Sequence, residues 1–451
     1  MASAVEQLAK NANWGALAKA TELKNRILFV LGALLVYRLG TYIPVPGIDP
    51  AVWNEIFESK GGGILDMFNM FSGGALSRMT IFALNIMPYI SASIIMQLAT
   101  AMSKNLEELK KEGEVGRMKI NQYTRYLTVL LATVQAYGLA VGLESMQGQG
   151  GSAVINPGMF FRISTVITIV GGTVFLMWLG EQITSRGVGN GISLIIFAGI
   201  VAELPRAIGS TLELTRQGTF SGFELLLLVA MVFSVIALIV YVERAQRRVV
   251  VQYPKRQVGN QMSQGQTNHI PLKLNTSGVI PPIFASSLLL LPMTVVGFAG
   301  AGGSDFWADV TRYLQHGNPV YMVLYGLLIA FFSFFYTAIV FNPEENAETL
   351  RKYGGFVPGI RPGRNTADYL DYVLTRISTV GAIYLVFICL LPEFMISQYN
   401  MPFYFGGTSL LIVVSVTMDT VAQIHSHLIA HQYEGLVKKT KLRGRSGGRR
   451  R

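Results

Sequence analysis

Side chains that could carry catalytic or metal chemistry are few in this sequence, and their spacing does not suit it. His425, His427 and His431 form a group of potential metal ligands, but offsets of two and six residues do not share one face of a helix. The glycine-rich run at 187–191 lacks the Gly-Lys-Ser/Thr that completes a phosphate-binding loop. No Ser/His/Asp constellation stands out. We therefore expect no metal, no cofactor and no enzymatic activity.

Asp419 is the one acidic residue that lies well inside an apolar stretch long enough to cross a membrane. Ionisable side chains at such positions are costly to bury and often belong to proton pathways. A structural role, in which a loop or another subunit supplies the partner, is an equally good interpretation.

Two pairs of isoleucines offer a different chemistry, which is the exclusion of water and ions. Ile86 and Ile90 are four residues apart, as are Ile192 and Ile196, so each pair shares one helix face. Around a pore, such side chains would block ions, because an ion would have to shed hydration water to pass. From spacing alone, packing against lipid or within the core explains the pairs equally well.

The elements that must position these residues are membrane-spanning helices. Only 14% of the 451 residues are charged and 51% are hydrophobic, against about 25% charged residues in soluble proteins. A soluble chain this apolar could not cover its surface, so a polytopic membrane protein is expected. A bilayer core about 30 Å thick requires roughly 20 apolar residues per helix. Ten segments meet this requirement: 24–43, 78–102, 122–144, 160–182, 189–205, 221–242, 275–297, 319–341, 371–392 and 405–430.

The distribution of basic residues sets the expected orientation. Most of the 37 lysines and arginines fall into alternate connections and the two terminal segments. By the positive-inside rule, these regions lie in the cytosol, so both chain ends are expected there. The formal net charge of +11 then mainly records membrane topology, and binding of nucleic acid is the weaker interpretation.

Five spans precede the connection near residues 206–218 and five follow it. An odd number of spans per half makes the two halves run oppositely through the bilayer, which is the plan of inverted-repeat transporters and channels. We expect an N-terminal half over 1–210, a C-terminal half over 211–432 and a basic cytosolic tail over 433–451. The fold class is therefore all-α, with ten transmembrane helices in two inverted, pseudo-symmetric halves.

Three insertions between spans are unusual. Residues 61–77 are too short to span and rich in glycine and methionine, which suggests a half-helix that dips into the membrane beside protein or a cavity. The long basic connections at 243–274 and 342–370 are expected in the cytosol. They suit binding to a partner, although a solvated topology determinant is the simpler alternative.

Eight segments, spread in order from about residue 20 to 440, together resemble the SecY family of protein-translocation channels. They are RLGTYIPVPGID (38–49), MFNMFSGGALSR (67–78), IMPYISAS (86–93), LMWLGEQIT (176–184), GNGIS (189–193), FNP (341–343), FVPGIRPG (356–363) and PFYFGGTS (402–409). The family fold has ten helices in two halves of five, which agrees with the spans above.

The resemblance implies a protein-conducting pore that carries unfolded secretory polypeptides across the membrane and releases hydrophobic segments sideways into lipid. Its waist would be a ring of six isoleucines. We refer to these residues as the isoleucine ring: Ile86, Ile90, Ile192, Ile196, Ile283 and Ile412.

A plug and a lateral gate are also implied by the resemblance. The plug is a short segment, about 64–76, that closes the pore from the outer side; a re-entrant structural turn is the alternative. Its residues are Ile64, Leu65, Met67, Phe68, Met70, Phe71, Gly73 and Gly74. The gate lies between the second and seventh spans, where Ser91, Gln135 and Asn275 would form a polar lining. Ordinary hydrogen bonding between helices would explain such residues too.

Family partners are the small SecE and SecG subunits, the motor ATPase SecA, the ribosome, preproteins with signal sequences, and membrane lipid. Lys255, Arg256 and Arg361 match positions used for docking, where cationic loops suit RNA phosphates or acidic protein surfaces. The sequence departs from its relatives twice. Gly259 is followed by Asn260-Gln261 where some relatives carry a basic pair, and Asn85 stands where glycine is common.

Two other classes of protein remain as rivals at this stage. A secondary carrier for small solutes would need polar or charged groups at a substrate site near the midplane, and Asp419 could couple it to protons. A membrane scaffold would need no plug. We expect a passive channel in the cytoplasmic membrane, powered by its partners because it has no nucleotide site.

Overall fold

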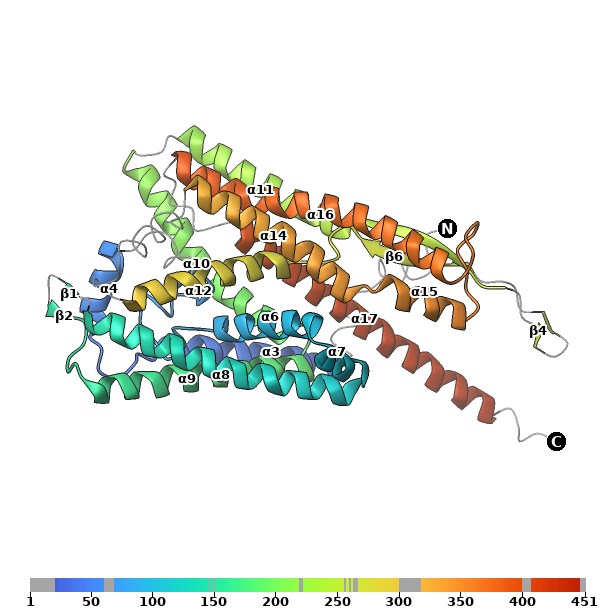
Figure 1. The fold of residues 1–451 in the computed structure, drawn as a ribbon, viewed down its shortest axis with the longest axis horizontal. Coiled ribbons are helices and arrows are strands. Elements are labelled where there is room, and N and C mark those ends of the chain that lie inside the picture. Colours follow the sequence, from blue (N-terminus) through green and yellow to red (C-terminus); the bar gives the residue numbers. More distant parts are fainter. Residues whose placement is uncertain are drawn as a thin grey trace.

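The computed structural model describes residues 21–60, 69–145, 147–148, 151–218, 222–254, 257–258, 261–262, 267–299, 318–399 and 407–446. Helices dominate these residues, and the strands are short antiparallel pairs. Figure 1 shows long helices running roughly side by side, with the small β elements at the two ends of the bundle.

The N-terminal half contains long helices, three shorter helices and one two-residue strand pair. They are α3 (Thr21–Gly40), α4 (Pro50–Lys60), α6 (Met87–Met102), α7 (Lys104–Lys111), α8 (Glu114–Ser145), β1 (Gln147–Gly148), β2 (Gly151–Ser152), α9 (Met159–Arg186) and α10 (Gly191–Arg216). The start of α10 is capped by Asn190, whose side chain accepts a hydrogen bond from the backbone of Ile192. The helix continues to Arg216, beyond the division expected at residue 210.

The C-terminal half adds the two longest helices and a β hairpin formed by β3 and β6. Its elements are α11 (Gly222–Arg244), β3 (Gln246–Gln252), β4 (Gln257–Val258), β5 (Gln261–Met262), β6 (Thr267–Lys273), α12 (Ile280–Ala299), α14 (Pro319–Val340), α15 (Pro343–Lys352), α16 (Arg364–Tyr399) and α17 (Gly407–Ser446). Proline at the start of α14 and α15 follows an asparagine cap in each case, so both helices begin sharply.

Each of the ten expected spans corresponds to a helix, so the all-α polytopic membrane fold is confirmed. Within the described residues, seven helices are long and apolar enough to cross a bilayer by length and composition: α8, α9, α10, α11, α14, α16 and α17. Of the other three, α6 and α12 are shorter apolar helices, and α3 carries Arg26 and Arg38 within its 20 residues.

The second span differs from its expected form. Its sequence predicts a helix over 78–102, but the helix begins only at Met87, because the preceding residues form a buried series of turns. Met79 and Asn85 have φ values of 44° and 48° there, a left-handed backbone that continuous helix does not allow. This irregular backbone lies at membrane depth but is enclosed by protein, where its polar groups find partners.

Helices of the two halves form the two sides of the bundle. In Figure 1, α3, α6, α8 and α9 lie together on one side and α11, α14 and α16 on the other, while α17 starts beneath α14 and runs obliquely away from the bundle. Between them, α12 packs against α6, α8 and α14, and α10 packs against α9 and α17. One continuous apolar core therefore runs through both halves and includes the centre of the molecule.

A second, smaller core supports the β3–β6 hairpin. β3 and β6 pair antiparallel, with Val249 opposite Ile270. Buried side chains from the strands, from the loop before α16 and from the first turns of α16 pack together here: Val249, Val251, Leu272, Val357, Leu370, Val373 and Ile377. The hairpin is therefore fixed to the end of α16, and movement of one requires movement of the other.

Candidate functional site: the closed centre and its seam

Four residues of the isoleucine ring meet at one small apolar cavity in the middle of the bundle. Ile86 and Ile90 come from α6 and its first turn, Ile196 from α10, and Ile283 from α12. Plug residue Phe71 closes the same cavity. The volume open to a water molecule is about 10 Å³, which is at the limit of what a single water requires. The centre of the molecule is thus dry and sealed.

The remaining two isoleucines occupy neighbouring positions in the core. Ile412, on α17, is completely buried. Ile192, in the first turn of α10, is half-buried, and its side chain lies close to Gly180 of α9. Both belong to the central apolar core but are not among the residues that line the small cavity.

The described part of the plug is held tightly by its surroundings. Residues 64, 65, 67 and 68 lie outside the described residues, whereas Met70, Phe71, Gly73 and Gly74 are buried. The backbone turns after residue 71, and Gly73 and Gly74 have φ values of 65° and 81°. Only glycine adopts such angles without cost, so the turn that ends the plug depends on this pair.

Close backbone contact fixes this turn against α10. A Cβ atom placed on Gly199 would lie only 2.7 Å from the carbonyl oxygen of Phe71. On the other side, the Trp53 indole of α4 donates a hydrogen bond to the carbonyl of Leu76 at 3.0 Å. Asn69 accepts a hydrogen bond from the backbone of Ser77 at 2.8 Å, which closes the turn on itself. The exit of the plug is therefore a rigid, fully packed structure.

The seam between the halves is the contact of α12 with α6 and α8. Ser91 and Gln135 are buried there, on α6 and α8. The sequence suggested that Gln135 and Asn275 line this seam together, but the structure does not bring them into a hydrogen bond. Asn275 instead donates to the Glu243 carboxylate at 2.6 Å and to the carbonyl of Gly278 at 3.1 Å.

Asn275 belongs to a polar cluster at the base of α12 that sequence reasoning missed. Ser277 donates to the Asn275 side-chain oxygen at 3.1 Å and shares a hydrogen bond with Ser333 of α14 at 3.2 Å. These hydrogen bonds connect the end of α11 with the residues just before α12 and with α14. Its one sequence signal was Glu243, an acid at the edge of an apolar stretch.

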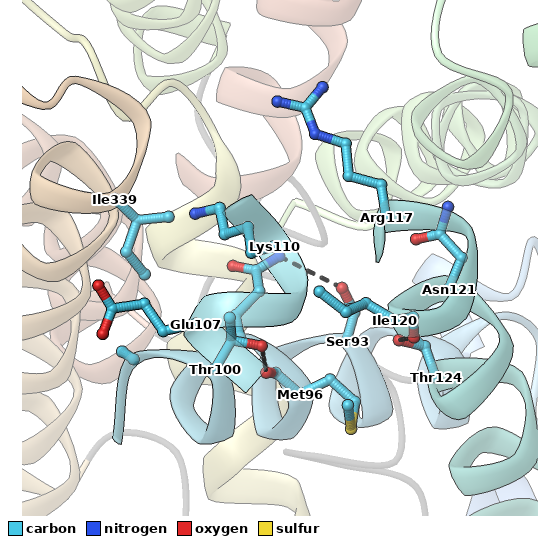
Figure 2. Close-up of a pocket in the computed structure, with 12 residues that line it drawn as sticks. Ser93, Met96, Thr100, Glu107, Lys110, Arg117, Ile120, Asn121, Thr124 and Ile339 are labelled. Carbon is cyan, nitrogen blue, oxygen red and sulfur yellow. Dashed lines mark hydrogen bonds between the residues drawn. The ribbon is translucent and has the colours of Figure 1, made fainter. Parts of the chain in front are cut away.

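A larger cavity lies between α6, α7 and α8. Figure 2 shows its walls, formed by these helices, with Ile339 of α14 closing the fourth side. Its volume is about 480 Å³, within the range of cavities that hold small ligands or side chains. Lys110 and Arg117 line this cavity together with Glu107. The cavity therefore adjoins the seam helices α6 and α8, and both polar and apolar side chains line it.

Of the docking residues expected from the sequence, Arg361 is exposed in the loop before α16. Lys255 and Arg256 lie outside the described residues. Arg247 and Arg248 of β3 are exposed as well, so both connections carry exposed basic side chains.

Asp419 has a structural neighbour. It is exposed on α17, and its carboxylate lies 4.0 Å from the ammonium group of Lys273 at the end of β6. No group of three His, Cys, Asp or Glu residues suitable for a metal ion occurs in the part of the chain that the structure describes. The ion pair connects the hairpin to α17.

Comparisons with known proteins agree with this architecture. The family model described as SecY matches residues 80–421. Over 424 residues the chain is 57% identical to protein translocase subunit SecY of Escherichia coli K12, covering 94% of this chain and 96% of the relative.

Solved structures also match along most of the chain. A protein-conducting channel structure has a TM-score of 0.63 at 18% identity, and a SecY structure concerning its plug domain has 0.64 at 19%. Each match covers 89% of this chain and 92% of the other. Sec61 from a canine ribosome–channel complex has a TM-score of 0.60 at 17% identity, with the same coverage.

Proposed function

The chain belongs to the SecY family, and from this premise we propose that unfolded polypeptides cross the membrane through the isoleucine ring at its centre. The protein is a multi-pass membrane protein and a protein-conducting channel subunit, not an enzyme. Its work is to open a path and to close it again.

The observation that carries this proposal is the convergence of Ile86, Ile90, Ile196 and Ile283 with Phe71 around one dry cavity. Three helices and the plug contribute to it, so a path through the molecule must pass between them. Branched apolar side chains offer no directed bond to a passing chain, and an ion gains nothing there for its lost hydration. Such a ring can yield to a polypeptide and still resist ions.

Lateral release follows from the way α12 sits between the halves. It contacts α6 and α8 of the first half and α14 of the second. Separation of α12 from α6 and α8 would expose the central path to lipid, into which a sufficiently apolar segment would partition.

We infer that the basic cytosolic surface docks partners that supply energy. Structural relatives include channels in ribosome complexes, and the exposed Arg247, Arg248 and Arg361 suit phosphates of ribosomal RNA. The same surface suits an acidic face of the SecA motor, and exposed apolar helix faces suit SecE, SecG and lipid. This arrangement corresponds to the cytoplasmic membrane with both chain ends in the cytosol.

A crosslinking experiment tests the path directly. Photoreactive probes would replace Ile86 and Ile283 in the assembled channel, and a secretory chain would be stalled during translocation. We expect crosslinks from both sites to the stalled chain. Probes at Ile167 and Ile383 are matched controls, because these isoleucines of α9 and α16 are 67% and 66% exposed on the outer surface of the bundle. Equal crosslinking from all four sites, or none from the ring, would contradict the proposed path.

A further inference from the structure

Three consecutive carbonyl groups at the exit of the plug each accept a hydrogen bond from a different side chain. The acceptors are the backbone oxygens of residues 71–73. Their donors are the Asn85 amide to Phe71 at 2.6 Å, the Tyr37 hydroxyl to Ser72 at 3.1 Å and the Arg38 guanidinium to Gly73 at 2.7 Å. We call this set of three bonds the carbonyl clamp.

The three donors belong to two elements. Tyr37 and Arg38 are in the last turn of α3, which packs against α9, α10 and α17 and forms no part of the seam. Asn85 is in the buried turn before α6, immediately next to ring residue Ile86. Because α6 is a seam helix, one donor of the clamp is attached to an element that must move when the seam opens.

Asn85 is held in an unusual conformation that suits this position. It is 2% exposed, its φ is 48°, and its backbone N–H donates to the carbonyl of Phe82 at 2.8 Å. Asparagine tolerates the left-handed region better than most residues other than glycine. Glycine would fit the same backbone without strain, so the side chain is not needed for the turn itself.

We propose that Asn85 is a positioning residue that couples the plug to the lateral gate. While α6 is in its closed position, the Asn85 amide holds the Phe71 carbonyl and keeps the plug beneath the ring. When a hydrophobic segment parts the seam and α6 moves, this bond breaks and the plug is released. Asn85 thereby raises the hydrophobicity that a segment needs to open the channel. The inference rests on the proposed path through the ring.

Asn85→Gly tests the coupling, because it removes the amide and keeps the backbone angle. The channel would be reconstituted with its companion subunits, in a Ser72→Cys background that reports plug exposure to a small thiol reagent. The native Cys389 is buried and adds little background. Loss of one buried hydrogen bond should raise the resting labelling rate by roughly 2- to 10-fold. Segments of lower hydrophobicity should then be translocated.

Two further variants separate coupling from a general effect on folding. Asn85→Asp keeps the size of the side chain but replaces the donor with a carboxylate that faces a carbonyl, so it should also raise labelling. Thr128→Val removes a buried hydroxyl bond within α8, to Thr124, and should leave labelling and the hydrophobicity threshold unchanged.

The outcomes distinguish a failure of the proposed Asn85 coupling from a failure of the proposed path through the isoleucine ring. Unchanged labelling and threshold in Asn85→Gly, with normal crosslinks at Ile86, would overturn the coupling and leave the path intact. Reduced thermal stability without increased labelling would make Asn85 merely structural and would also overturn the coupling. Absence of crosslinks from Ile86 in the otherwise wild-type channel would instead contradict the path.

Discussion

The isoleucine cavity and the carbonyl clamp lie side by side, yet they close the channel by opposite kinds of interaction. Apolar side chains form most of the cavity wall, and the contacts that they make have no preferred direction. The clamp consists of three hydrogen bonds, each with a fixed donor and acceptor. Phe71 belongs to both, since its ring lines the cavity while its carbonyl is an acceptor of the clamp.

This difference shows how one small region can both adapt to a passing polypeptide and change between two states. Apolar contacts weaken gradually as side chains separate, so the ring can adapt to polypeptides of different bulk. Hydrogen bonds are lost over a fraction of an ångström, so the clamp has two states. The isoleucine ring is suited to sealing around any polypeptide, and the carbonyl clamp is suited to controlling the release of the plug.

Substitution in the ring should give the largest effect. Ile90→Asn places an amide in a cavity whose wall is mainly apolar, at a cost of about 1–3 kcal/mol to the closed state. The open population should rise roughly 5- to 150-fold, measured as resting conductance of the reconstituted channel. Ile90→Leu, which keeps an apolar side chain of equal size, is the control. If the Ile90→Asn channel has the same resting conductance as the wild type, the isoleucine ring does not form the seal.

A steric clash between α10 and the carbonyl clamp should have the next largest effect. Gly199→Ala adds a methyl group 2.7 Å from the Phe71 carbonyl oxygen, which must displace the end of the plug at a cost of about 1–2 kcal/mol. Resting conductance should therefore rise by a factor of roughly 5 to 30. Gly209→Ala, in the same helix but with nothing within 4 Å of the added Cβ, should behave as wild type. Equal conductance in the two variants would rule out this contact as a support of the plug.

Removal of one anchoring hydroxyl should have a smaller effect. Tyr37→Phe deletes the bond to the Ser72 carbonyl and keeps the aromatic packing against Phe82. Loss of about 1 kcal/mol corresponds to a roughly fivefold rise in plug labelling at rest. Since Tyr37 is on α3, away from the seam, the hydrophobicity threshold should change less than in Asn85→Gly. A larger threshold change in Tyr37→Phe would reverse the assignment of the coupling residue.

The base of α12 should give the smallest change. Asn275→Leu removes the hydrogen bond to Glu243 and loosens the start of a seam helix without touching the ring or the clamp. The hydrophobicity needed for membrane insertion should shift by about one leucine in a test segment, or about 0.5 kcal/mol. A graded series of segments measures this shift, and resting conductance should stay at the wild-type level. Identical insertion curves would remove Asn275 from the gate.

The spans and their order were accessible from sequence because they depend on hydrophobicity and length alone. Ile86 and Ile90 could be placed on one helical face for the same reason. The break in the second span could not be predicted, because Met79 and Asn85 adopt positive φ without the glycine that normally signals it. Their conformation is imposed by the packed surroundings.

The polar contacts of the site were the least predictable part. The clamp acceptors are backbone carbonyls, which are the same in every residue and leave no mark in a sequence. Asn275 was expected to line the gate together with Gln135, but its side chain donates a hydrogen bond to Glu243. Which polar side chains meet depends on helix rotation, and apolar periodicity does not fix rotation when both faces of a helix are apolar.

Helix α17 has a mechanical implication. Its 40 residues correspond to a length of about 60 Å, twice the thickness of the hydrocarbon layer. Ile412 lies near one end of this helix, and the other end projects away from the bundle (Figure 1). A partner protein that pushes on the projecting end of α17 can therefore shift the core around Ile412, beside the waist, without entering the membrane.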